Sequence, residues 1–142
     1  MAARKRRSDP AMSGVADLAD ILAGRRVLLV EDEFLVAMDV ESMLERAGCA
    51  AIGPAARLEQ AMTLARGEAI DAAVLDVNLN GTPVFPVAKA LSERGIPFLF
   101  TTGCDGASIP PAFQAVPRLQ KPFGEDDLIH GLKAVMNGRA GS

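Results

Sequence analysis

Five short aliphatic runs, each followed by a segment of helical spacing or of loop-forming residues, constrain the fold of this 142-residue chain. Apolar runs of this length are typical of strands buried on both faces, as in a parallel sheet. We expect strands at residues 26–30, 49–55, 71–77, 96–102 and 116–120. The intervening sequence predicts helices at residues 33–47, 58–67, 84–95 and 124–138. Such alternation predicts an α/β fold with a five-stranded, parallel, doubly wound sheet.

Three other segments complete the pattern. Residues 14–22 have apolar residues at helical spacing, which predicts a short amphipathic helix. Residues 78–83 have the composition of a loop. Residues 103–113 are interrupted by glycines and a Pro-Pro pair, so any helix there must be short or irregular.

The first helix of the alternation has a predicted core face and a predicted end. Phe34, Met38, Met43 and Leu44 recur at spacings compatible with one face. Gly48 stands where a C-terminal cap belongs.

The composition is that of a globular protein. Hydrophobic residues make up 49% and charged residues 23%, and the formal net charge of −3 gives no general reason to expect nucleic-acid binding. The basic run at residues 4–7 is not followed by the apolar stretch of a secretory signal, and no segment reaches the roughly 20 apolar residues of a transmembrane helix. We therefore expect a cytoplasmic protein in which residues 1–24 are a basic, flexible extension and the isolated Cys49 and Cys104 are reduced thiols.

Polar residues follow the predicted strands. Glu31 and Asp32 follow the first strand and Asp76 ends the third, while Thr102 ends the fourth and Lys121 follows the fifth. Right-handed crossovers bring the carboxyl ends of parallel strands to one edge, where open sheets of this kind bind ligands. Each residue alone could be a helix cap or a solvated loop residue, but the five together predict a functional site.

The residue types at this edge favour a divalent cation and phosphoryl chemistry. Clustered carboxylates repel one another unless solvent, a partner or a cation offsets them, and carboxylates without His or Cys favour Mg²⁺ over zinc. An aspartate near such a metal can attack phosphorus as a nucleophile. An ammonium and a hydroxyl can then stabilise the charge of the transferred group.

Four short motifs, in register along the chain, resemble those of one protein family. They are VLLVEDE at 27–33, VLDVNLNG at 74–81, PFLFTTG at 97–103 and LQKPF at 119–123. Together they resemble the receiver domain of response regulators in two-component signalling. The resemblance implies the flavodoxin-like receiver fold, with a receiver domain over residues 25–138 and a tail at 139–142.

The resemblance also implies a metal site and a phosphoacceptor. Asp76 is expected to accept the phosphoryl group and to contribute to Mg²⁺ binding. Asp32 would ligate the metal directly, Glu31 would bind it through water, and the backbone carbonyl of Asn78 would be a further ligand.

Other residues match the part of the family pattern that responds to phosphorylation. Lys121 would pair with the phosphoryl group, and its bond to Pro122 would be cis. Thr102 is our choice for the switch hydroxyl, with Thr101 second, because successive strand residues face opposite sides. Arg118 stands where relatives usually carry Tyr or Phe, and a permanently charged guanidinium cannot enter an apolar pocket as an aromatic ring does.

The lack of this aromatic residue, together with PFLFTTG, resembles the FAT GUY subfamily of receivers. Members are commonly stand-alone receivers of alphaproteobacteria that work with histidine kinases of the HWE or related classes. The resemblance thus predicts a single-domain response regulator without a DNA-binding output domain or membrane insertion.

We expect Asp76 to take its phosphoryl group from a histidine kinase or a phosphotransfer protein. Output would be a contact with a downstream protein or withdrawal of phosphate from a shared kinase, and the chain would not be an enzyme beyond possible autodephosphorylation. One alternative is a degenerate receiver that interacts with partners without phosphorylation. Another is a Mg²⁺-dependent phosphohydrolase, which generally needs a second Asp where this chain has Asn78.

Overall fold

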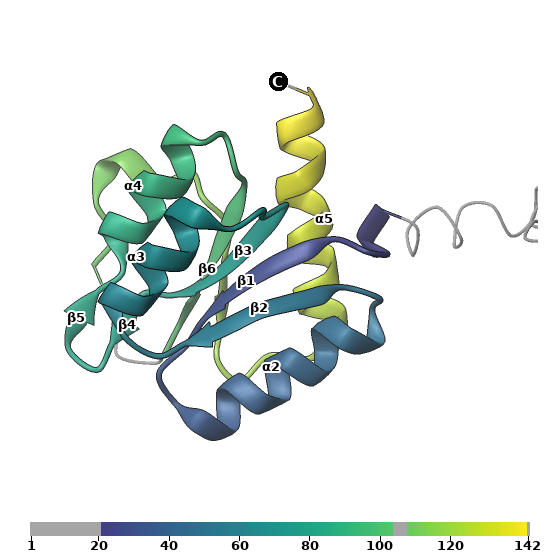
Figure 1. The fold of residues 1–142 in the computed structure, drawn as a ribbon, viewed down its shortest axis with the longest axis horizontal. Coiled ribbons are helices and arrows are strands. Elements are labelled where there is room, and N and C mark those ends of the chain that lie inside the picture. The colour runs from purple at the N-terminus through teal and green to yellow at the C-terminus, as the bar shows by residue number, and fades with distance from the viewer. Residues whose placement is uncertain (1–20, 104–107, 142) are drawn as a thin grey trace, which may run out of the picture.

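The structure, a computed structural model, describes residues 21–103 and 108–141 (Figure 1). The basic run at 4–7, most of the helix expected at 14–22, and Cys104 lie outside the described residues. No helix in the described ranges is both long enough and apolar enough to cross a membrane.

A five-stranded parallel sheet forms the centre of the molecule, as the sequence predicts. Its strands lie in the order β2-β1-β3-β6-β7, and every neighbouring pair is parallel. The order reverses beside β1, so two crossovers leave in opposite directions and the carboxyl ends of β1 and β3 lie next to each other. The strands are β1 (Arg26–Val30), β2 (Ala50–Ala55), β3 (Ala72–Asp76), β6 (Phe98–Thr102) and β7 (Arg118–Gln120).

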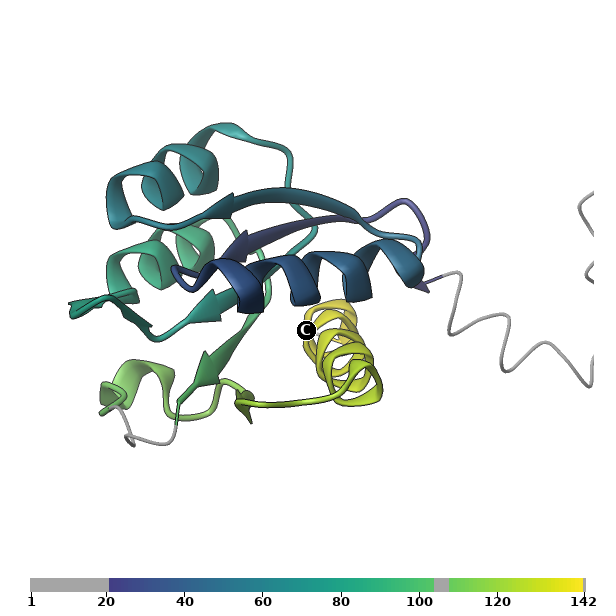
Figure 2. The ribbon, with the colours of Figure 1, turned by 90° about the horizontal axis from the view of Figure 1, so that it is seen from below.

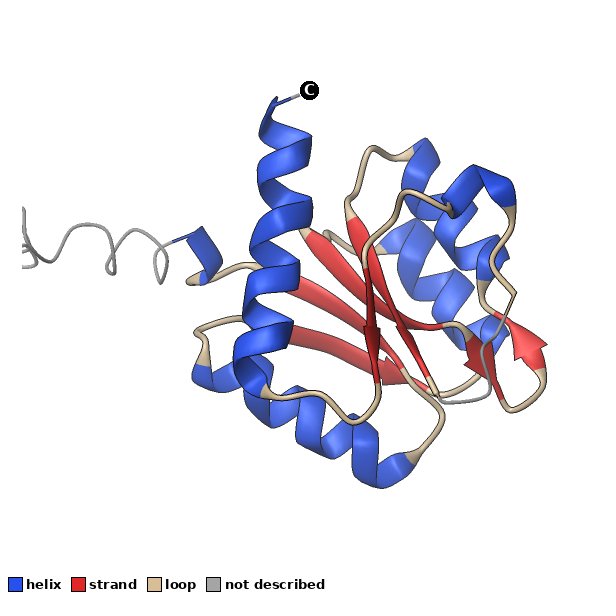
Figure 3. Cartoon of the chain, turned by 180° about the vertical axis from the view of Figure 1, so that it is seen from behind, coloured by secondary structure: helices blue, strands red, loops and turns tan. Residues whose placement is uncertain are grey.

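Two pairs of helices cover the two faces of the sheet. The first pair lies side by side under one face, and the second pair covers the opposite face (Figures 2 and 3). The first pair is α2 (Phe34–Arg46) and α5 (Glu125–Gly141), and the second is α3 (Leu58–Gly67) and α4 (Phe85–Glu93). The last helix runs three residues past Gly138, the end that the sequence predicts.

Alternate residues of each central strand enter separate cores. In β1, Leu28 and Val30 pack towards α3 and α4, whereas Val27 and Leu29 pack towards α2 and α5. This two-sided burial explains why the strands read as continuous aliphatic runs. The strand ends are thereby held in register, which fixes where the polar residues that follow them lie.

The loop expected at 78–83 is instead a small hairpin, so that expectation was wrong. Strands β4 (Asn78–Leu79) and β5 (Thr82–Pro83) pair antiparallel around Asn80 and Gly81. These two residues have φ values of +53° and +92°, the left-handed backbone that a two-residue hairpin turn requires. Asn-Gly is a strong signal for a hairpin turn, and the hairpin forms here although its second strand contains Pro83.

The predicted core face of α2 was also partly wrong. The helix buries Ala37, Val40, Met43 and Leu44, whereas Phe34 is 73% and Met38 49% exposed. The small Ala37 sets the buried face together with Val40, and a search for large apolar residues misses it. Gly48, with φ of +92°, follows the helix end as the sequence predicts.

The segment expected to be irregular at 103–113 contains one short helix in its described part. A 3-10 helix, η1 (Pro111–Phe113), follows Pro110. Phe113 packs against Phe85, Phe98 and Phe100, with ring centroids 5.9–6.1 Å apart. This aromatic contact attaches the segment to the face of the sheet that α4 covers.

Candidate functional site

Three carboxylates meet where β1 and β3 end. Oxygen atoms of Glu31, Asp32 and Asp76 all lie within 4.8 Å of one another. Glu31 and Asp76 are buried, and Asp32 is partly exposed. Glu31 and Asp32 directly follow β1, and Asp76 is the last residue of β3, so the sheet register brings them together.

Lys121, which follows β7, points its ammonium at these acids. Its Nζ lies 3.2 Å from Glu31 Oε1, from Glu33 Oε1 and from Asp76 Oδ2. An ammonium has three N–H donors, so three carboxylates can use all of them. The Lys121–Pro122 peptide bond is cis, as the family resemblance implies.

Backbone N–H groups orient two of the carboxylates. The N–H of Asn78 donates to Asp76 Oδ1 at 3.1 Å, and the N–H of Glu33 donates to Glu31 Oε2 at 3.0 Å. The other oxygen of the Asp76 carboxylate accepts from Lys121. Asp76 is therefore held at both oxygens before any ligand arrives.

The environment changes the acidity of two groups. The pKa of the Asp76 carboxyl is raised to about 7, first by burial and then by the neighbouring Glu31 carboxylate, while the Asn78 N–H and Lys121 oppose the rise. Burial alone would lower the pKa of the Lys121 ammonium, but Asp76 and Glu31 raise it above its ordinary value. The site is therefore short of positive charge at neutral pH.

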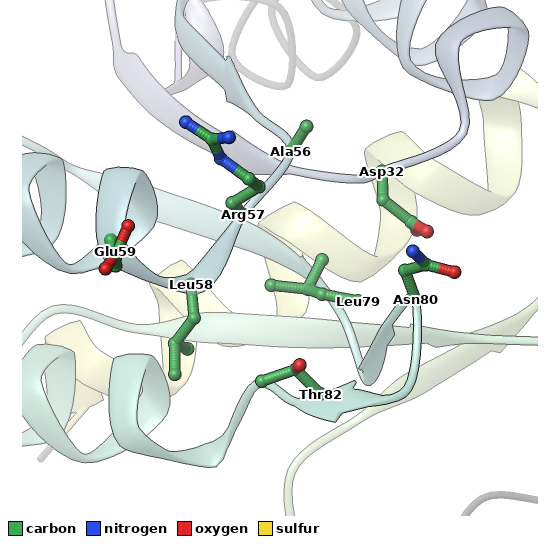
Figure 4. Close-up of a pocket in the computed structure, with 8 residues that line it drawn as sticks. All are labelled: Asp32, Ala56, Arg57, Leu58, Glu59, Leu79, Asn80 and Thr82. Carbon is green, nitrogen blue, oxygen red and sulfur yellow. The ribbon is translucent and has the colours of Figure 1, made fainter.

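The residues present fit a hard divalent cation. All candidate donors are oxygens; three carboxylates contact the Lys121 ammonium, and a fourth, that of Asp32, lies beside Glu31 and Asp76. Asp32 also lines an open cleft of about 680 Å³ that contains Leu79, Asn80 and Thr82 of the hairpin region (Figure 4). Because Mg²⁺ keeps several water ligands, a carboxylate facing an open cleft suits it.

A second cleft, of about 540 Å³, lies on the Lys121 side of the site. Its lining is mostly apolar and comes from α2 and from the segment that follows β7. The lining residues are Glu33, Leu35, Val36, Asp39, Val40, Gly103, Lys121, Pro122 and Phe123. The exposed Phe34, Leu35 and Met38 lie on the same half of α2. Asp32 thus lines one cleft, and Glu33 and Lys121 line a second, mostly apolar one.

The two threonines occupy different positions. Thr101 is buried and lies opposite Asp76 in the pairing of β3 with β6. Thr102 is partly exposed, and its carbonyl accepts a 2.8 Å hydrogen bond from the N–H of Lys121. In the described ranges the Asp76 carboxylate accepts hydrogen bonds from Asn78 and Lys121, and neither threonine hydroxyl donates one to it. Thr102 as the switch hydroxyl stays a prediction.

Arg118 lies at the start of β7 and is exposed. Its guanidinium donates a 2.9 Å hydrogen bond to the carbonyl of Gln114, and the Gln114 side-chain amide donates in turn to the carbonyl of Ile109. Arg118 therefore fastens the η1 segment from outside, as expected for a charge that stays at the surface.

Sequence reasoning assigned no role to Glu33. The signal was present, because three consecutive acids follow β1 and only the first two received a role. Glu33 lies at the N-cap position of α2, and its side chain reaches Lys121 rather than the backbone of its own helix.

Comparison with known proteins defines the family to which this geometry belongs. The profile of the response regulator receiver domain matches residues 27–133, and the chain belongs to this family. The expected five-stranded receiver fold is therefore confirmed.

Individual proteins that are similar to this chain are also response regulators or regulatory proteins by name, or receivers by structure. The solution structure of SdrG from Sphingomonas melonis Fr1 is similar at 39% identity, with a TM-score of 0.72 over 81% of this chain and 98% of that one. A response regulator receiver protein from Sinorhizobium medicae is 28% identical, with a TM-score of 0.71 over 83% and 98% of the two chains. The transcriptional regulatory protein PdtaR of Mycobacterium tuberculosis is 28% identical over 130 residues, and the match spans 89% of this chain but 63% of PdtaR.

Proposed function

We propose that this chain is a single-domain response regulator that accepts a phosphoryl group on Asp76. One observation carries the proposal: a buried aspartate is held by Lys121 and Asn78 beside two further carboxylates at the switch point of the sheet. A carboxylate with a pKa raised to about 7 at the ligand-binding edge of such a sheet is typical of a functional site.

In the reaction, an oxygen of the Asp76 carboxylate forms a bond to phosphorus. The bond between phosphorus and the donor breaks, which is a P–N bond in a phosphohistidine, and its electron pair goes to the donor nitrogen. Lys121 stays beside Asp76 and offsets the charge of the added group. The N–H of Asn78 and Lys121 fix the carboxylate beforehand, which reduces the reorganisation that the transfer needs.

Asp32, Asp76, the backbone carbonyl of Asn78 and, through water, Glu31 would hold Mg²⁺. The ion would supply positive charge that allows a phosphoryl group to approach an acidic site. Glu31 also keeps Lys121 in place, because its buried carboxylate pairs with the ammonium.

The readout side of the site would be Thr102 and the segment that follows it. The Thr102 hydroxyl would turn to the phosphoryl group, and the 103–113 segment and β7 would change their contacts with it. Arg118 replaces the aromatic residue that usually couples to this hydroxyl, which fits a FAT GUY receiver. The same feature favours the second candidate, a degenerate receiver that works without phosphorylation.

The donor would be a histidine kinase, of the HWE or a related class, or a phosphotransfer protein in the cytosol. Its helical surface would contact the exposed Phe34, Leu35 and Met38, since α2 begins directly after the carboxylates and the donor must bring its phosphohistidine to Asp76. Output would be a contact with another protein or withdrawal of phosphate from the kinase, without catalysis on other substrates.

Intact-mass spectrometry after incubation with acetyl phosphate tests the proposal. Wild-type protein with Mg²⁺ should gain a single phosphoryl group, and it should gain none with a chelator or with Asp76→Asn. An adduct that persists in Asp76→Asn would place the acceptor elsewhere. Complete absence of an adduct would favour the degenerate receiver, and partner capture by unmodified protein would then be compared between wild type and Asp76→Asn.

A further inference from the structure

Among the partners of Lys121 in the described part of the chain, Glu33 is the one that can leave without stranding a buried charge. The three carboxylates around the ammonium lie at the same distance of 3.2 Å, but their surroundings differ. The side chains of Glu31 and Asp76 are 3% and 5% exposed, whereas that of Glu33 is 62% exposed. A carboxylate that returns to water loses little, while an unpaired buried one is strongly unfavourable.

We propose, on the basis of the phosphoryl-accepting function inferred above, that Glu33 is a displaceable latch on Lys121. Its carboxylate occupies one ammonium donor in the resting protein and gives that donor up to a phosphoryl oxygen on Asp76. Glu33 is thus a positioning residue that sets how readily the site accepts a phosphoryl group.

The local backbone frees the Glu33 side chain for this role. Glu33 stands at the N-cap of α2 in an extended conformation, with φ of −83° and ψ of 115°, but its side chain makes no capping hydrogen bond. Its N–H is already bound to Glu31 Oε2. The side chain is therefore available to extend over Lys121, and its loss removes no cap.

The negative charge added by phosphorylation favours displacement of Glu33 from Lys121. An ionised carboxylate carries one negative charge, whereas an acyl phosphate carries up to two at neutral pH. Glu33 both repels the incoming group and competes with it for Lys121. Removing the Glu33 charge should therefore favour phosphoryl acceptance, by about two- to fivefold, which is the range that a partly exposed ion pair allows.

Two variants with the same charge change separate the latch from general electrostatics. Glu33→Gln removes the latch, and Asp39→Asn removes a carboxylate from the helix that follows Glu33 and from the same cleft. Asp39 is exposed and makes no ion pair with any residue in the described ranges. Urea unfolding of both variants checks that each retains its fold.

The first measurement is binding of beryllofluoride with Mg²⁺, since this anion imitates a phosphoryl group on a carboxylate. The second is the rate of adduct formation from acetyl phosphate, in which an Asp76 oxygen bonds to phosphorus and acetate leaves with the electron pair of the broken P–O bond. Glu33→Gln should bind beryllofluoride and react two- to fivefold more readily than wild type, and Asp39→Asn should stay within about 1.5-fold. Equal gains in both variants, or a loss in Glu33→Gln, would overturn the latch.

A third measurement does not depend on phosphorylation. Lys121 should react faster with acetic anhydride in Glu33→Gln than in wild type or Asp39→Asn, as read by peptide mass spectrometry, because one of its three partners is gone. Unchanged reactivity would overturn the latch even in a protein that accepts phosphate. A different outcome would be that wild-type protein forms no adduct although Lys121 reacts faster in Glu33→Gln. That outcome would count against the proposed function and would support only the contact between Glu33 and Lys121.

Discussion

The two sides of the site are held together by different kinds of interaction. On the carboxylate side, which comprises Glu31, Asp32, Glu33, Asp76 and Lys121, ion pairs to Lys121 and two backbone hydrogen bonds hold the carboxylates of Glu31 and Asp76. On the readout side, which comprises Thr102, η1 and Arg118, a short segment is held by the apolar packing of Ile109, Phe113 and Val116 and by two hydrogen bonds from side chains to backbone carbonyls. The first side is fixed by charge and the second by apolar packing.

This difference separates chemistry from response. Phosphoryl transfer needs groups that are aligned in advance, and the hydrogen-bonded carboxylates of Glu31 and Asp76 provide that alignment. A response needs an element that changes its contacts for a small free-energy difference, and a three-residue 3-10 helix with no buried residue of its own meets that need. Substitutions on the two sides should therefore differ in kind.

Lys121→Met should have the largest effect. It leaves Glu31 and Asp76 buried without their shared cation, so we expect the free energy of unfolding to fall by roughly 3–5 kcal/mol at pH 8. Urea unfolding measures this loss, which should shrink at pH 6 because Asp76 then takes up a proton. Phosphoryl acceptance should fall by about 100-fold or more.

Lys89→Met is the control for this test, since Lys89 is an exposed lysine on α4. Its stability should stay within about 0.5 kcal/mol of wild type. If both variants lost the same amount, the carboxylate side would depend on net charge rather than on the ion pairs at Asp76.

Asp76→Asn should show that the ionised Asp76 carboxylate destabilises the metal-free fold. A carboxyl whose pKa is 3.8 in the unfolded chain and about 7 in the fold favours the folded state below pH 4, and this contribution is lost as pH rises through 7. The metal-free Asn variant should therefore exceed wild type by on the order of 2–4 kcal/mol at pH 8, with the gap closing towards pH 4. Thermal or urea unfolding across this range checks the slope.

Added Mg²⁺ is the counterpart of that experiment. It should stabilise wild-type protein, whose ionised Asp76 can take part in binding, more than Asp76→Asn, and so narrow the gap at pH 8. A gap that does not change with pH would mean that burial does not determine the acidity of Asp76.

The sequence predicted the carboxylate side better than the readout side, for a physical reason. Parallel strands impose one edge on residues distant in sequence, so Glu31, Asp76 and Lys121 could be brought together from strand ends alone. Contacts made by flexible side chains have no such constraint, and the reach of Glu33 to Lys121 was missed. The exposure of Phe34 could not be predicted because α2 has one apolar stripe with Phe34 and Met38 and another with Ala37 and Val40. Spacing alone does not say which of the two stripes faces the sheet.

Phe113→Ala tests the apolar side and should have an intermediate effect. Phe113 is partly buried against Phe85 and Phe100, so we expect a loss of about 1–3 kcal/mol in the free energy of unfolding, less than for a fully buried ring. Phosphoryl acceptance should change by less than about twofold, since this ring packs against the aromatic side chains of Phe85, Phe98 and Phe100. Phe113→Leu, which keeps most of the apolar contact, should recover much of the stability; a large loss of acceptance in either variant would show that the two sides are coupled.

Arg118→Gln should have the smallest effect and is the sharpest test of the separation. The guanidinium donates to one backbone carbonyl at an exposed position, so its loss should lower the free energy of unfolding by less than about 1 kcal/mol. The carboxylates are held by Lys121 rather than by Arg118, so the rate of adduct formation from acetyl phosphate should stay within about 1.5-fold of wild type. Arg118→Lys keeps the charge but loses the planar donor, so it should behave as Arg118→Gln does if the contact with Gln114 matters. If Arg118→Gln slowed phosphoryl acceptance while Arg118→Lys did not, the positive charge of Arg118 would be acting on Asp76 across the strand, and the readout side would share in the chemistry.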